Sequence, residues 1–305
     1  GESKEGGGAE GGGGGKTGKK KAAKKEVVTR REPTPRAAVP GLGSASCKVL
    51  SWNVDGLRAP GREEDLAKLI ADEQPDVLCL QETKLSSSWE PWRRVLPGYD
   101  AFWSHCIAKK GYSGTVAFVR QVPGSSPAQV EGPGSFEASE PSASSPEGGS
   151  KPKQKSIASF FGGGKAPGKA TKGEAAPQGS GGAPGTHAVR RVVFGIGHDK
   201  HDREGRSITL HFDTFIAVAL YVPNSGMKLE RLDYRVQEWN RDLQAYVRGL
   251  EEAEGNKPVV VLGDLNVAHC DPDIYNYFAP HIKKTPGCTA VEREAHTAWL
   301  ATGYV

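Results

Sequence analysis

Four short apolar runs, each followed by carboxylate or amide side chains, constrain the fold of this chain more than any other feature. Each run is rich in β-branched residues and leucine and is bounded by turn residues, which is typical of a buried strand. The runs cover residues 49–55, 77–82, 217–224 and 259–266. Four such strands predict a sheet-containing domain that is large enough to bury a real core.

The polar residues at the ends of these runs predict a functional site. They are Asp55, Glu82, Asn224, Asp264 and Asn266. Neighbouring strands would bring these side chains together at one edge, where hard oxygen ligands suit Mg²⁺ and a phosphate group. A single polar strand end is most often the point at which a strand reaches solvent. Its repetition in four runs favours a site.

Helices are expected between the strands, so the sequence predicts a layered α/β fold. Apolar residues at helical spacing predict helices over residues 63–73, 229–252 and 292–300. Further strands are expected over residues 115–119, 192–194 and 207–212. The order in which the strands pair does not follow from the sequence.

Two low-complexity segments divide the chain. Residues 1–46 are rich in Gly and Lys, and residues 121–186 are rich in Gly, Ser, Pro, Ala and Lys. Such compositions cannot bury enough apolar surface to offset the entropy of ordering the backbone. We therefore expect a disordered basic tail and a disordered insertion. The folded domain would consist of residues 47–120 and 187–305.

The composition favours an intracellular protein. The five cysteines are odd in number and show no zinc-ligand spacing, which is typical of a reducing compartment. No apolar stretch reaches membrane-spanning length, so we expect no membrane association. The Lys-rich segment over residues 19–25 is a candidate for nuclear import or nucleic-acid contact, the alternative being a solvated charge run. We expect the protein to act in the nucleus.

Longer strings around the polar residues resemble the exonuclease III class of apurinic/apyrimidinic endonucleases. The strings are Leu50–Arg58, Leu80–Lys84, Gly111–Gly114, Tyr221–Asn224 and Gly263–His269, and they occur in the order found in that family. The wider superfamily also contains DNase I-like nucleases and phosphoesterases that act on inositol phosphates or sphingomyelin. The full strings around Asp55 and Asn266 point to the DNA-repair branch.

This resemblance implies a four-layer α/β sandwich of the DNase I type. It also implies a DNA repair enzyme of base-excision repair that hydrolyses the backbone 5′ to an abasic site, with 3′-phosphodiesterase and exonuclease activities as further options. Mg²⁺ would be the cofactor, with Mn²⁺ as a substitute. The expected partner is double-stranded DNA with abasic sites, bound by a monomer.

The matching motifs also imply roles for the residues that surround the metal and the water. Glu82 would be the principal Mg²⁺ ligand, with Asp55 close to it. Asp264 would activate or orient the attacking water, and Asn266 would help to place that water. Asn53 would support this network. In-line attack on a phosphodiester requires these parts, since charge must be neutralised and a water positioned.

Further residues are expected to contact the substrate. Tyr221 and Asn224 would hold the scissile phosphate, because both can donate hydrogen bonds without adding negative charge beside it. Arg58 and Tyr112 would contact the DNA backbone, and Lys84 would sit beside the carboxylates. Two alternatives stay open at this point. Lys84 could serve only as an ion-pair partner, and Tyr112 could serve only to pack its loop.

The end of the sequence departs from the family pattern. That pattern continues with a Leu-Asp-Tyr strand and a Ser-Asp-His strand, which supply a carboxylate–histidine pair, a further Asp and a pocket for the abasic sugar. The sequence reaches Val305 before either strand, and His269, His281 and His296 do not fit the histidine's motif. We therefore expect a C-terminally truncated chain, either a fragment or an incomplete gene model, with impaired activity.

The second low-complexity segment contains a motif of its own. Its pattern is Gln-x-x-aliphatic-x-x-aromatic-aromatic, and it resembles the peptide that docks on the sliding clamp PCNA. The residues that match are Gln154, Ile157, Phe160 and Phe161. A short helical turn would place the apolar three on one side as a plug. The alternative is a chance apolar cluster. Two other functions also stay open, a non-catalytic DNA- and clamp-binding protein and a phosphoesterase with a non-DNA substrate.

Overall fold

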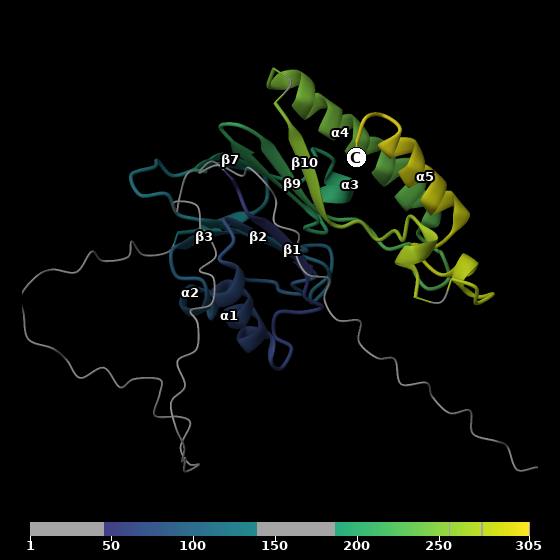
Figure 1. Ribbon diagram of the computed structural model, residues 1–305, viewed down its shortest axis with the longest axis horizontal. Helices are drawn as coiled ribbons and strands as arrows, with labels where there is room; N and C mark the ends of the chain where they lie inside the picture. The colour runs from purple at the N-terminus through teal and green to yellow at the C-terminus, as the bar shows by residue number, and fades with distance from the viewer. Residues whose placement is uncertain (1–45, 139–186, 256, 276, 305) are drawn as a thin grey trace, which may run out of the picture. The chain divides into compact units, whose positions relative to one another are not determined.

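The computed structural model describes residues 46–138, 187–255, 257–275 and 277–304 (Figure 1). The predicted import segment at residues 19–25 lies outside the described residues. So do the four residues of the clamp-docking motif, Gln154, Ile157, Phe160 and Phe161. No helix in the described part of the chain is both long enough and apolar enough to cross a membrane.

The first sheet of the described residues has five strands in the order β1-β2-β4-β3-β6. These strands are β1 (Val49–Asn53), β2 (Val77–Gln81), β4 (Thr115–Arg120), β3 (Tyr99–Ser104) and β6 (Ser135–Glu137). β1 and β2 run parallel, whereas the other neighbours are antiparallel. The parallel pair brings the carboxyl ends of the first two polar-ended runs to the same edge.

The second sheet of the described residues also has five strands, in the order β10-β9-β8-β7-β5. These strands are β10 (Val259–Asp264), β9 (Ile216–Tyr221), β8 (Ser207–Phe212), β7 (Val189–Phe194) and β5 (Gln129–Glu131). β10 and β9 run parallel, as do β5 and β7, and the remaining pairs are antiparallel. The other two polar-ended runs therefore also finish side by side.

The two sheets pack face to face, with helices on the outer side of each. Alternate residues of β2 show the arrangement. Val77 and Cys79 face the second sheet, whereas Leu78 and Leu80 face the helical side. Because both faces of β2 are covered, the strand is apolar throughout rather than alternating. Burial raises the pKa of the Cys79 thiol to about 12, and the side chain packs as a small buried hydrophobe.

The helices complete four layers and confirm the predicted α/β sandwich. On the first sheet lie α1 (Arg62–Glu73) and α2 (Trp92–Val95), and on the second lie η2 (Tyr234–Trp239) and α4 (Asn240–Ala253). The remaining helical segments are α3 (Asp199–Asp202), η3 (Asp271–Asp273), η4 (Ile282–Lys284) and α5 (Ala290–Leu300). The helix expected over residues 229–252 starts later than predicted, and its first part, η2, is a π-helix.

Ordered structure extends beyond the predicted boundary at residue 120. β5 and β6 lie inside the range that we expected to be a disordered insertion, and they pair with β7 and β3 respectively. Phe136 of β6 stacks on the buried Phe102 with ring centroids 5.0 Å apart. Both strands are only three residues long, so they carry no periodic pattern from which a strand could be predicted. The described part of the first sheet therefore reaches Glu137.

Candidate active site

The site forms where β1, β2, β9 and β10 end. Asn53 and Gln81 are register partners at the end of the first sheet, and Tyr221 and Asp264 are partners at the end of the second. Beyond the strands, Asp55, Glu82 and Asn266 adopt positive φ angles of 48°, 55° and 48°. A positive φ is uncommon for residues with a Cβ, and such residues gather at functional sites.

One side chain joins the two sheets directly. The Asn53 amide, Nδ2, donates to Glu82 Oε1 at 3.1 Å and to Asp264 Oδ2 at 2.8 Å. The Tyr221 hydroxyl of the second sheet donates to the same Glu82 oxygen at 2.6 Å. The residues expected as metal ligand, water-orienting base and phosphate holder therefore share one hydrogen-bond network across the two sheets.

This network keeps Glu82 ionised. Burial on its own would raise the pKa of the Glu82 carboxyl. Hydrogen bonds from Tyr221 and Asn53, followed by one from Lys84, act in the opposite direction and hold the pKa below its ordinary value. Burial, followed by the contact with Glu82, raises the pKa of the Tyr221 phenol. The phenol therefore remains a proton donor at neutral pH.

Lys84 lies between the two carboxylates that were expected to bind metal. Its ammonium contacts Asp55 Oδ1 and lies 3.1 Å from Glu82 Oε2. The hydrogen bond with Lys84 lowers the pKa of Asp55, and the same bond raises the pKa of Lys84. The ion-pair alternative for Lys84 thus has direct geometric support.

The oxygen donors fit one hard divalent cation. Glu82 and Asp55 converge on a single positive charge, which in this structure is the Lys84 ammonium. Carboxylate oxygens are the ligands that Mg²⁺ prefers, and this ion commonly keeps several waters beside one or two protein carboxylates. Within the described residues, there is no group of three or more His, Cys, Asp or Glu side chains placed to enclose a metal.

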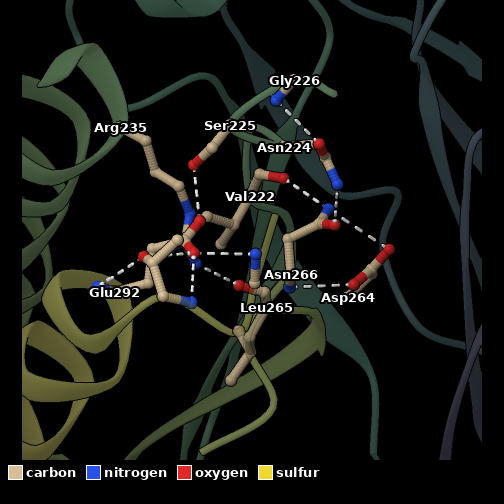
Figure 2. Close-up of polar contacts among 11 residues, drawn as sticks. Val222, Asn224, Ser225, Gly226, Arg235, Asp264, Leu265, Asn266 and Glu292 are labelled. Carbon is tan, nitrogen blue, oxygen red and sulfur yellow. Dashed lines mark hydrogen bonds and ion pairs between the residues drawn. The ribbon is translucent and has the colours of Figure 1, made fainter. Parts of the chain in front are cut away.

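A second set of contacts fixes the turn after β10 (Figure 2). The Asn266 backbone N–H donates to Asp264 Oδ1 at 2.9 Å, and its side-chain amide donates to the Val222 carbonyl at 2.8 Å. Asn224 Nδ2 donates to Asn266 Oδ1 at 2.9 Å. The five polar residues predicted from the strand ends thus lie at one edge, in two connected groups.

The expected DNA contacts differ in how firmly they are held. Arg58 is exposed in the turn after Asp55. The half-buried Tyr112 accepts hydrogen bonds on its hydroxyl from Arg206 at 2.9 Å and from Arg231 at 2.8 Å. These bonds fix the loop that carries Tyr112, which supports the packing alternative.

Sequence reasoning missed the role of Arg206. This residue is 2% exposed, donates to the Tyr221 carbonyl at 3.1 Å, and places its guanidinium 4.5 Å from the centre of the Tyr221 ring. It therefore supports the phenol that donates to Glu82. The segment from His201 to Arg206 also resembles the exonuclease III class, and this resemblance was the one sign in the sequence that Arg206 belongs near the site.

Comparison with known proteins settles the family. The sequence matches the Endonuclease/Exonuclease/phosphatase family over residues 50–279. The chain belongs to this family. It is 31% identical to an exodeoxyribonuclease of Bacillus subtilis, over 85% of the chain and 73% of that protein. It is also 31% identical to a DNA-(apurinic or apyrimidinic site) endonuclease of Dictyostelium discoideum, over 85% of the chain and 52% of that protein.

Solved structures agree with this assignment. An AP endonuclease from Leishmania major shares 25% identity and a TM-score of 0.54, over 84% of the chain and 66% of that structure. A 3′-5′ exonuclease from Neisseria meningitidis shows the same fold, with a TM-score of 0.52 at 22% identity. The predicted fold, family and enzyme class are confirmed. The chain spans only half to three quarters of the length of the curated relatives just described. The roles of the individual site residues stay predictions.

Proposed function

We propose that this protein is a divalent-metal-dependent endonuclease that hydrolyses the DNA backbone 5′ to an abasic site. The observation that carries the proposal is the bridge from Asn53 to both Glu82 and Asp264. It unites a candidate metal carboxylate with a candidate base at the open ends of the parallel strands, where ligands commonly bind in α/β folds. The names of the Dictyostelium relative and of a DNA repair nuclease of Danio rerio, 32% identical, support DNA as the substrate.

Glu82 is the proposed principal ligand of Mg²⁺, for which Mn²⁺ would substitute, and Asp55 lies beside it. When bound, the ion would neutralise charge on the phosphate and so stabilise the transition state. Lys84 already pairs with both carboxylates. Its positive charge stays available to a phosphate oxygen once another cation satisfies those carboxylates.

Asp264 is the proposed base that orients the attacking water. Its two oxygens accept hydrogen bonds from the Asn266 backbone and from Asn53, and these bonds hold the carboxylate in one orientation. A base held in this way loses little freedom when it takes up the water's proton.

Two neutral donors, the Tyr221 hydroxyl and the Asn224 amide, are proposed to receive the scissile phosphate. The amides of Asn224 and Asn266 lie 2.9 Å apart, measured from the nitrogen of the first to the oxygen of the second. Asn266, which accepts from Asn224, is proposed to help place the attacking water. Donors held in place by the surrounding hydrogen bonds stabilise the charge that develops on the non-bridging oxygens.

The proposal is tested by comparing substrates under one condition. We expect the protein, in Mg²⁺, to cut a duplex that carries one tetrahydrofuran abasic analogue and to leave the matched intact duplex uncut. Binding of the abasic duplex without incision would favour the non-catalytic alternative. Release of phosphate from inositol phosphates, with no cutting of DNA, would favour the phosphoesterase alternative.

A further inference from the structure

A buried ion pair lies beneath the two turns of the candidate site. Arg235 of η2 is 3% exposed and Glu292 of α5 is 1% exposed. Arg235 Nη1 lies 3.1 Å from Glu292 Oε1. Figure 2 shows the pair together with the turns that carry Asn224 and Asn266. Glu292 lies outside the residues that match the family, which end at residue 279.

Arg235 holds one end of a peptide unit whose other end binds the proposed base. Its Nη2 donates to the carbonyl of Leu265 at 2.8 Å. The N–H of that same peptide belongs to Asn266 and donates to Asp264 Oδ1 at 2.9 Å. Because a peptide unit is planar, fixing its carbonyl also fixes the direction of its N–H. The guanidinium thus sets the orientation of a bond that holds the Asp264 carboxylate.

The backbone at this turn needs such support. Asn266 has a φ of 48°, in the left-handed region. Residues other than glycine stay in this region only where the surrounding structure determines them. The bond from Arg235 and the bond to Asp264 act on the two sides of the Leu265–Asn266 peptide and supply that determination.

Glu292 extends the same support to the second turn. Its Oε1 accepts from the Ser225 hydroxyl at 2.5 Å, and Ser225 directly follows Asn224. Its Oε2 accepts from the Gly287 N–H at 2.8 Å and from the Thr289 hydroxyl at 2.7 Å. One ion pair therefore reaches both turns that present the site amides.

A purely stabilising role does not explain this pair. Within the described residues, Arg235 Nε and Nη1 are buried without a well-aligned hydrogen bond, although Nη1 is within ion-pair distance of Glu292. Leaving donors unpaired in a low-dielectric interior is costly, and buried ion pairs are often no more stable than apolar residues of similar size. Arg235 also lies in a π-helix, a rare element that is frequent at functional sites.

We propose that Arg235, held by Glu292, is a positioning residue for the hydrolysis. It sets the Leu265–Asn266 peptide so that Asp264 and Asn266 meet the attacking water in the reactive geometry. This inference rests on the proposed function. Because Arg235 is buried, it does not touch DNA, and its removal should change kcat rather than KM.

The first test is a kinetic comparison of variants on the abasic duplex. Arg235→Met combined with Glu292→Gln removes both charges, so that neither is left unpaired. We expect kcat to fall by about 10²-fold, as for a small misplacement of reacting groups, with KM unchanged. Arg235→Lys keeps the positive charge but loses the planar set of guanidinium donors. Compared with the double variant, it should therefore recover more of the thermal stability than of kcat. If the double variant does not fold, the Arg235→Lys variant alone provides the kinetic comparison with the unaltered protein.

Glu254→Gln is the matched control, because it neutralises one partner of the His211–Glu254 pair. His211 is the register partner of Ile216, at the far end of β9 from Tyr221. We expect this control to lose stability without losing kcat. If kcat follows thermal stability in the same way in all three variants, the ion pair is only structural and the proposal is overturned.

The second test does not depend on catalysis. Hydrogen exchange at the Asn266 backbone amide reports on its bond to Asp264. We expect faster exchange in the Arg235→Met/Glu292→Gln variant and in Arg235→Lys, but not in Glu254→Gln. Unchanged protection in both Arg235 variants would overturn the positioning role. If the unaltered protein fails to cut abasic DNA, the proposed function fails, and the exchange result still decides the role of Arg235.

Discussion

Glu82 accepts hydrogen bonds from two sheets while its second oxygen faces Lys84. Tyr221 and Asn53 both donate to Oε1, which leaves Oε2 beside the ammonium. Because Oε1 accepts both hydrogen bonds and Oε2 faces the ammonium, the carboxylate is held rigidly and still offers one oxygen to a cation. It also makes Glu82 the side chain on which the candidate metal site depends most.

Removal of either central carboxylate should nearly abolish incision. We expect Glu82→Ala to lose the metal ligand and Asp264→Asn to keep the shape but lose the charge that orients water. Each should lower kcat by about 10³-fold or more. Circular dichroism and a thermal melt should show an intact fold. Turnover close to that of the unaltered protein in either variant would mean that the site is wrongly assigned.

Tyr221→Phe should shift the pH dependence of metal binding. Hydrogen bonds hold the pKa of Glu82 below its unfolded value, so their stabilising effect is present above the unfolded pKa and is lost as pH falls through the folded pKa. Without the phenol, the folded pKa of Glu82 should rise. The acid limb of Mn²⁺ binding, measured by calorimetry at pH values below and above the ordinary Glu pKa of 4.5, should therefore move to higher pH. An unmoved or lowered limb would contradict this account.

At the scale of elements, the predictions succeeded where the pattern was long and buried. The strand expected over residues 207–212 is β8 with the same bounds, and the four polar-ended runs are all strands. The π-helix could not be foreseen, since Leu232, Val236 and Trp239 have the spacing of an ordinary α-helix. Arg235 in this π-helix pairs with Glu292, which lies far along the chain. Arg206 was missed for a similar reason, because its contact with Tyr112 joins distant segments.

Alanine substitutions at Gly263 of β10 and at Gly249 of α4 should change the free energy of unfolding in opposite directions. A Cβ on Gly263 would lie 1.9 Å from the Leu220 carbonyl oxygen, and its φ is +132°. Gly263→Ala should therefore destabilise the protein by about 3 kcal/mol or more. A Cβ on Gly249 in α4 would meet nothing within 4 Å, so Gly249→Ala should stabilise by about 0.5–1 kcal/mol. Urea titrations measure both. Equal changes in the free energy of unfolding for the two variants would show that the close approach of Gly263 to Leu220 does not require glycine.

At the scale of the whole molecule, the predicted clamp-docking motif lies outside the described residues and is tested apart from the folded domain. A peptide covering Lys151 to Gly164 should bind PCNA by itself. Replacing Phe160 and Phe161 with alanine should cost roughly 2 kcal/mol or more, if both rings act as buried hot spots. Calorimetry of the two peptides against the clamp measures the difference. Equal affinity, or no binding by either peptide, would reduce the motif to coincidence.

The site also belongs to this larger scale, because no single element contains it. Asn53 ends β1 and Glu82 directly follows β2 of the first sheet, whereas Tyr221 and Asp264 end β9 and β10 of the second. The apolar runs predicted Glu82 and Asp264, whereas Asn53 and Tyr221 were expected only from the family resemblance. It did not reveal that Asn53 is the bridge, because that role depends on how the two sheets face each other.

The most direct test of the central claim is to map the cut in an end-labelled abasic duplex. With Mg²⁺, we predict one product that ends in a 3′-hydroxyl immediately 5′ to the abasic site, and a second that keeps the abasic residue on its 5′-phosphate. Chelation of the metal with EDTA and the Glu82→Ala variant should both remove these products. Incision 3′ to the site, or incision that survives both controls, would contradict the assignment.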